Sequence, residues 1–215
     1  MSSENTIRFN PYNPHGEIAV SKRNLPHWEQ PQGCYFITFR LIDSIPQNLL
    51  VELKHEKDLW LDNHPKPWDE STSREFGQLF TKREQEWLDA GYGECHLKSG
   101  EIRALVISSL EKFDRTRYDL DCYTLMPNHV HFIWQMRGKF SNNRELQSLK
   151  GASARKCNKH LNRTGNFWMD ESYDRPIRDK DELTAFRKYI DSNPSKACLK
   201  ENHYSLRLNH RLATY

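Results

Sequence analysis

The chain has 215 residues, of which 36 % are hydrophobic, 12 % are aromatic and 28 % are charged, and its formal net charge is +3. This length is enough for one domain that buries its core without disulfide staples, and the aromatic content argues against a disordered chain. No run approaches the length of a membrane span, and the first residues lack the basic cluster and apolar run of a signal peptide. The cysteines are odd in number and form no C-x-x-C pair, which fits a reducing cytoplasm.

The first half of the chain predicts a strand and two helical stretches behind an irregular start. Residues 1–33 contain four prolines and no sustained periodicity, and we expect them to form an arm. Residues 34–41 alternate and are rich in aromatic and β-branched types, which predicts a strand. Pro46 then opens an apolar-periodic helix. Prolines break that helix, and residues 65–100 are expected to form an insertion with a helix over residues 75–90.

The second half predicts a compact alternation of strands and helices. In chain order these are a helix over 101–113, strands over 118–127 and 129–136, a helix over 145–161, an edge strand over 172–178 and a helix over 181–192 that Pro194 ends. Short antiparallel strands with helices covering one face predict an α+β fold of ferredoxin-like type. We expect residues 34–200 to form this domain and residues 201–215 to form a tail.

Two histidines of the second half have the spacing of metal ligands. His129 and His131 are two residues apart in a strongly β-forming segment, so both imidazoles point to the same face of a sheet. Imidazole binds divalent transition metals well, but two histidines do not complete a site. The alternative is a pair of surface histidines on a half-exposed strand.

A tyrosine and an asparagine in the last predicted helix are candidates to complete that site. Tyr189 and Asn193 are four residues apart and therefore lie on one helix face. A phenol titrates near pH 10, about three units above neutrality, and a nearby cation helps it to attack a phosphate by favouring the phenolate. Asn193 has a side-chain oxygen suited to a third metal ligand. The alternative is a tyrosine on a buried helix face and an asparagine that caps the helix.

Several segments in order resemble the REP-associated tyrosine transposases, which are single-tyrosine transposases with a His-hydrophobic-His (HUH) motif. The resemblance covers roughly residues 28–200 and is carried by YFITFRL, MPNHVHFIW, SLKGASARKCNK, FWMDESYDRPIR and RKYIDSNPSKA. It implies an HUH nuclease domain that cleaves and rejoins single-stranded DNA beside hairpins, using Mg or Mn. His129, His131 and Asn193 would be the metal ligands. Tyr189 would be the nucleophile that becomes joined to the 5′-phosphate, with Tyr173 as a competing candidate.

The resemblance also suggests a role for a basic stretch of the chain. Residues 137–168 contain eight lysines and arginines and one acid, an excess that could neutralise several phosphates, although such a run is often only a solvated helix face. The candidate DNA contacts are Lys150, Arg155, Lys156, Lys159, Arg175 and Arg178. The protein is expected to work as a monomer or homodimer. The alternatives are a DNA-binding module that recognises hairpins without cutting, and an HUH replication initiator or relaxase.

Overall fold

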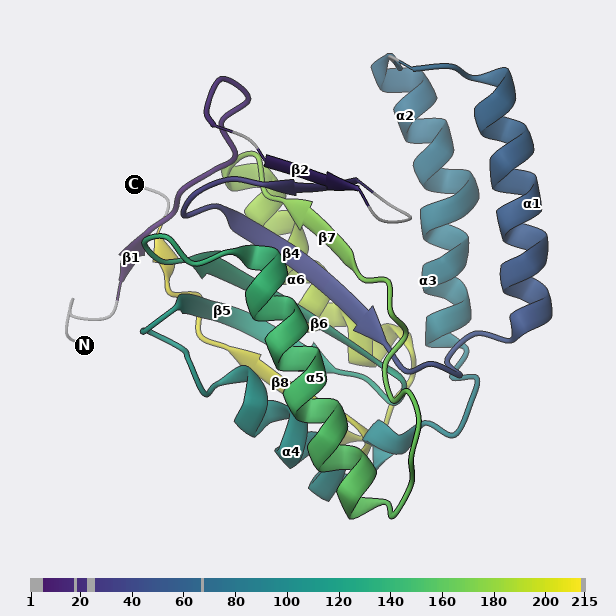
Figure 1. Cartoon of the computed structure of the whole chain (residues 1–215), viewed down its shortest axis with the longest axis vertical. Coiled ribbons are helices and arrows are strands. Elements are labelled where there is room, and N and C mark those ends of the chain that lie inside the picture. Colours follow the sequence, from purple (N-terminus) through teal and green to yellow (C-terminus); the bar gives the residue numbers. More distant parts are fainter. Residues whose placement is uncertain (1–5, 18, 23–25, 67, 214–215) are drawn as a thin grey trace.

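The centre of the molecule is a five-stranded antiparallel sheet. The structure is a computed structural model that describes residues 6–17, 19–22, 26–66 and 68–213. The strands have the order β7-β4-β6-β5-β8, and every neighbouring pair is antiparallel (Figure 1). Their bounds are β4 Cys34–Arg40, β5 Tyr118–Leu125, β6 His129–Met136, β7 Tyr173–Pro176 and β8 Ser205–Leu208. The predicted α+β class with an antiparallel sheet is confirmed.

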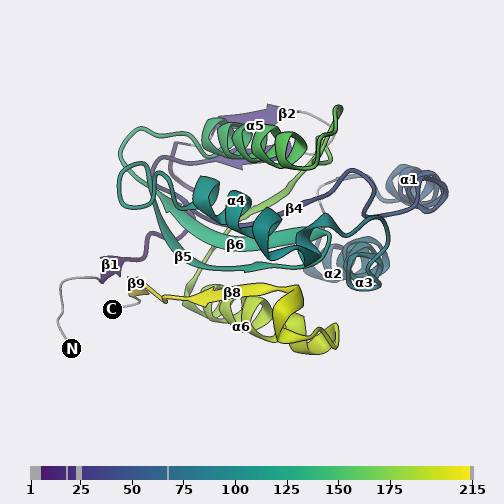
Figure 2. The ribbon, with the colours of Figure 1, turned by 90° about the horizontal axis from the view of Figure 1, so that it is seen from below.

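Helices cover both faces of this sheet. Helices α4 (Gly100–Leu110) and α5 (Asn142–His160) lie on one face, and α6 (Lys180–Lys196) lies on the other (Figure 2). The prediction of helices on one face is therefore incomplete, because it holds for α4 and α5 but not for α6. The physical reason is that both faces of the central strands carry apolar side chains: Phe132 packs toward α4 and α5, whereas Ile133 belongs to a second cluster with residues of α6.

Side-chain caps fix where the three helices that cover the sheet begin. The hydroxyls of Ser99 and Ser141 accept backbone N–H bonds at the starts of α4 and α5, and the carboxylate of Asp179 does so for α6. The predicted end of α6 at Pro194 is wrong, because the helix runs through Pro194 to Lys196. Proline lacks only its own N–H donor, and the carbonyls of the last turn still accept bonds, as Asn193 O does from Ala197 N at 3.1 Å.

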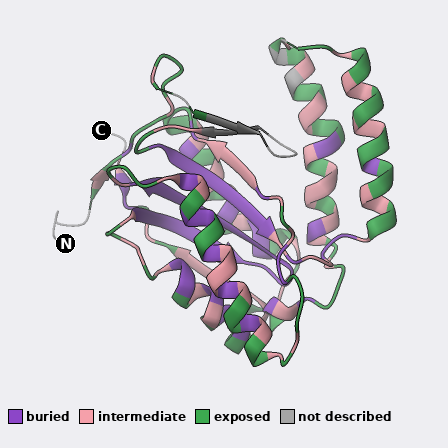
Figure 3. Cartoon of the chain, viewed as in Figure 1, coloured by how far each residue is buried: buried purple, intermediate pink, exposed green. Residues whose placement is uncertain are grey.

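A helical unit projects from the sheet and its covering helices, and we call it the protrusion (residues 47–89). It consists of α1 (Gln47–Asn63), α2 (Glu70–Phe76), a π-helical turn (Gly77–Thr81) and α3 (Lys82–Asp89). Its two arms run antiparallel and are more exposed than the sheet (Figures 1 and 3). Aromatic contacts hold the arms together, with Trp60 of α1 centred 5.3 Å from Phe76 of α2.

The two ends of the chain add further strands. β1 (Ile7–Arg8) pairs in parallel with β9 (Leu212–Ala213), and β2 (Ala19–Lys22) pairs with β3 (Pro26–Glu29). β8 is the edge strand beside β5 and follows a short helical turn, Glu201–His203. A similar turn, His96–Lys98, precedes α4. Within the described ranges, no helix combines the length and apolar character needed to cross a membrane.

Candidate active site

The two histidines of β6 lie side by side on the face that α6 covers. His129 is the first residue of β6 after the tight turn at Pro127 and Asn128, and His131 follows two positions later. Both side chains are fully buried, and their ring centroids are 4.6 Å apart. Strand alternation sends the intervening Val130 into the opposite core.

Hydrogen bonds orient the two imidazoles. Asn128 donates its amide N–H to the carbonyl of Tyr92 at 3.1 Å, so its Oδ1 faces His129 Nδ1 at 2.7 Å. His129 Nδ1 therefore carries the proton, and its Nε2 presents a lone pair. The Nδ1 of His131 lies 2.7 Å from the hydroxyl of Thr38 on β4. In both rings Nε2 is the atom left for a ligand.

Helix α6 brings Tyr189 and Asn193 to the same place. The Tyr189 hydroxyl lies 3.4 Å from His131 Nε2, and the two rings are 5.1 Å apart, edge to face. Asn193, one turn further along α6, is buried. Neither Asn193 Oδ1 nor His129 Nε2 has a hydrogen-bond partner among the described residues. A buried acceptor without a partner is unfavourable, so these two atoms fit the ligand set of a cation.

Burial sets the protonation of the site. It lowers the pKa of His129 to about 3, and it lowers the pKa of His131 as well, helped by the neighbouring His129. Both rings are therefore neutral at pH 7, the form that binds metals. Burial also raises the pKa of Tyr189, and Asp89 adds to this rise whereas a hydrogen bond with Asn193 opposes it. The phenol is thus protonated at pH 7, and a nucleophilic role would require its activation.

The protrusion contributes a residue that the sequence did not single out. Gln85 of α3 accepts a hydrogen bond of 2.6 Å from the Tyr189 hydroxyl. Asp89, one turn further along α3, has its pKa raised by burial to about 6, with Lys196 opposing the rise. No local pattern marks Gln85, because its role depends on where the protrusion folds relative to a helix about a hundred residues later.

The competing tyrosine also lies on this face but makes different contacts. Tyr173 of β7 is paired with Thr38 of β4, and Thr38 is paired with His131 of β6, so one strand separates Tyr173 from the histidines. Both tyrosine rings pack edge-on against Phe36, at centroid distances of 6.2 Å for Tyr173 and 5.8 Å for Tyr189, so the difference lies in the contacts of their hydroxyls. The phenol whose hydroxyl lies 3.4 Å from His131 Nε2 is that of Tyr189.

The basic residues predicted to contact DNA do not form one surface. Lys150, Arg155, Lys156 and Lys159 belong to α5, across the sheet from Tyr189. Arg175 pairs with Glu182 beside α6, and Arg178 is exposed just after β7.

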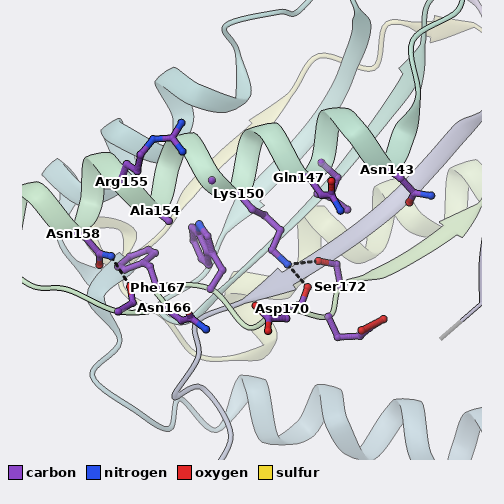
Figure 4. A pocket seen from close by; sticks show the side chains of 15 residues that line it. Asn143, Gln147, Lys150, Ala154, Arg155, Asn158, Asn166, Phe167, Asp170 and Ser172 are labelled. Atoms are coloured by element: carbon purple, nitrogen blue, oxygen red, sulfur yellow. Dashed lines mark hydrogen bonds between the residues drawn. The ribbon is translucent and has the colours of Figure 1, made fainter. Parts of the chain in front are cut away.

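Lys150 borders a cavity of about 550 Å³ between α5 and residues 165–172 (Figure 4). Its ammonium donates three bonds of 2.7–2.8 Å, to the carbonyls of Met169 and Asp170 and the hydroxyl of Ser172. All three of its N–H donors are thus used to hold the loop before β7. Arg155 lines the same cavity and its side chain is exposed.

One protein-family model agrees with the resemblance found in the sequence. Residues 100–193 match the model of a protein family described as "Transposase IS200 like". One similar solved structure is that of a REP-associated tyrosine transposase bound to a REP hairpin. It shares 14 % identity at a TM-score of 0.46, over 81 % of this chain and 74 % of that chain. No curated protein matches the chain. The matched segment, residues 100–193, contains His129, His131, Tyr189 and Asn193.

Proposed function

We propose that this protein is a metal-dependent endonuclease and strand transferase that acts on single-stranded DNA at hairpins through a 5′-phosphotyrosine intermediate. The observation that carries the proposal is that the Tyr189 hydroxyl lies 3.4 Å from Nε2 of the buried His131, whose ring is 4.6 Å from that of His129. The buried Asn193 lies one turn along the same helix as Tyr189. The IS200-like family match supports the reaction class. The hairpin substrate follows from the sequence resemblance.

Mg or Mn would be held by the Nε2 atoms of His129 and His131 and by Asn193 Oδ1. The two partnerless acceptors support this assignment, since each would otherwise cost about 1–3 kcal/mol on burial. A mixed set of imidazole and amide ligands suits Mn well, because Mg prefers oxygen alone. When bound, such a cation polarises the scissile phosphate and offsets the charge that develops on it.

The residues of the chain account for the remaining chemistry. The Tyr189 oxygen attacks phosphorus as the phenol loses its proton to solvent, and the P–O3′ bond breaks with the departing 3′ oxygen taking up a proton. The products are a tyrosine–phosphate ester and a free 3′-hydroxyl. Attack of a 3′-hydroxyl from another strand reverses these bond changes, releases Tyr189 and joins the strands. One phosphodiester is exchanged for another, so no energy-supplying cofactor is needed.

The proposed DNA contacts are the exposed members of the predicted set, one of which, Lys156, also donates to the hydroxyls of Ser108 and Ser109. Arg155, Lys156 and Lys159 of α5 are exposed, as is Arg178 at the end of β7. Arg178 follows β7 by two residues, and β7 is the strand at one edge of the sheet. We propose that DNA bound along α5 passes this edge to reach Tyr189. Lys150 and Arg175 would support this surface by holding β7 and the loop before it.

The proposal is tested with labelled single-stranded oligonucleotides that contain a hairpin with randomised flanks, incubated with the protein and Mn. A covalent protein–DNA adduct should form with wild type and with the matched control Tyr173→Phe, and should be absent with Tyr189→Phe. An adduct that survives Tyr189→Phe and is lost in Tyr173→Phe would reassign the nucleophile. Tight hairpin binding without an adduct under any divalent metal would favour a non-cleaving binding module.

A further inference from the structure

The protrusion contacts the proposed nucleophile directly. The Tyr189 hydroxyl has a single proton, and it donates that proton to Gln85 Oε1 at 2.6 Å. This bond fixes the direction of the O–H and leaves the oxygen lone pairs facing elsewhere, with His131 Nε2 at 3.4 Å. A neutral amide cannot take the proton away, so the contact orients the phenol without ionising it.

A second link runs from the end of the protrusion to His129. Tyr92 follows α3 by three residues, and its carbonyl accepts the amide N–H of Asn128 at 3.1 Å. That bond turns Asn128 Oδ1 toward His129 Nδ1. The same segment therefore positions the tyrosine through Gln85 and one imidazole through Asn128.

Packing holds α3 where these contacts require it. Phe80, five residues before Gln85, and Leu88, three residues after it, are both 4 % exposed. At the base of the protrusion, the backbone N–H of Glu94 donates to the Asp43 carboxylate at 2.8 Å. Gly93 has a φ of +83°, and a Cβ there would lie 2.5 Å from the carbonyl oxygen of Asp43. The protrusion is therefore anchored close to the end of β4.

We propose that Gln85 is a positioning residue for Tyr189, which makes the protrusion an integral part of the catalytic centre. The inference rests on the proposed function for its catalytic meaning. It predicts that loss of the amide oxygen frees the phenol to rotate and slows attack on phosphorus, while affinity for DNA is unchanged. A misplaced reacting group costs about ten- to a hundredfold in rate.

The first test needs no activity. Gln85→Met keeps the length and helix propensity of the side chain but removes the acceptor. Gln78→Met, at an exposed position of the same protrusion, is the matched control. In metal-free protein labelled with [13Cζ]tyrosine, the Tyr189 resonance, assigned from its loss in Tyr189→Phe, should shift in Gln85→Met and stay unchanged in Gln78→Met. An unchanged resonance in Gln85→Met would overturn the contact.

The second test separates binding from chemistry. With Mn and hairpin oligonucleotides, Gln85→Met should form the covalent adduct at least tenfold more slowly than wild type in single-turnover reactions. Its dissociation constant for the hairpin should remain within about twofold of wild type, because Gln85 is uncharged. Adduct formation at the wild-type rate would contradict the proposal that Gln85 positions Tyr189. A rate faster than wild type would also contradict it and would indicate that Gln85 restrains Tyr189. If wild type itself forms no adduct, the proposed function fails, and the tyrosine resonance alone decides on Gln85.

Discussion

The two faces of β6 compare an apolar packing surface with the surface that carries the proposed metal ligands. On the α4 and α5 face, Phe132 and Trp134 are fully buried in the apolar core, and the indole N–H of Trp134 is satisfied by Asn142 Oδ1 at 2.8 Å. On the α6 face, His129 and His131 are equally buried, but one of them keeps an acceptor without a partner in the described chain. Because side chains alternate between the two faces of a strand, the apolar residues and the histidines are kept apart. The apolar packing on one face can therefore offset the unfavourable burial of the histidines on the other.

The largest effect is expected when a side chain on the apolar face of β6 is truncated. Trp134→Ala should lower the free energy of unfolding by about 3–5 kcal/mol, because it removes buried apolar area and leaves a cavity. Asn193→Ala is the control from the other face, and it should change that free energy by less than about 1 kcal/mol while abolishing adduct formation. Urea unfolding followed by tryptophan fluorescence measures both variants. Similar losses of stability would show that the two faces are not specialised.

A smaller effect is expected from the hydrogen bond that orients His131. Thr38→Val keeps the shape of the side chain but removes the hydroxyl 2.7 Å from His131 Nδ1, and it should weaken Mn binding about 10–100-fold. The matched control is Thr124→Val on β5, since Thr124 is paired with His131 in the sheet but directs its hydroxyl to Met126 Sδ. Isothermal titration calorimetry measures the affinities. Equal weakening by both variants would contradict an orienting role for Thr38.

The smallest effect concerns acid stability. His129 has a pKa of about 3 when folded and about 6.5 when unfolded, so the unfolded state binds more protons between these values. Stability is therefore lost as the pH falls below about 6.5. Between pH 7 and 5.5, His129 should account for a loss of about 1 kcal/mol.

His129→Gln should remove this part of the pH dependence, measured by urea unfolding of metal-free protein at both pH values. Asp89 acts with the opposite sign, because its raised pKa stabilises the fold at low pH. Asp89 is present in both wild type and the His129→Gln variant, so its contribution to the pH dependence cancels when the two are compared. Parallel pH profiles for wild type and variant would contradict the burial of a neutral imidazole.

Local patterns predicted most of the sandwich and the spacing within the site. Aromatic and β-branched alternation marked β4 and β6, and apolar periodicity marked α4. A period of two placed His129 and His131 on one face, and a four-residue helical spacing placed Tyr189 one turn from Asn193, as the structure has them. These features depend only on neighbours in the chain.

The features that escaped prediction depend on contacts between distant residues. β8 is four residues long and is recognisable as a strand only through its pairing with β5, about eighty residues earlier. The face that α6 covers, the Gln85 contact and the bonds made by Lys150 also arise only when separate segments meet. The sequence places the basic stretch near the histidines along the chain, but α5 packs on the other side of the sheet.

The two-residue turn between β5 and β6 imposes a constraint on the length of the chain at this point. Leu125 pairs with Val130 across Pro127 and Asn128, and this pairing fixes which residues of β6 face α6. One extra residue in the turn, with the pairing moved by one position, would exchange the imidazoles for Val130 and Phe132 and bury the histidines in the apolar core. Surface loops usually tolerate insertions, but here an odd change in the number of turn residues would remove the histidines from the proposed active site.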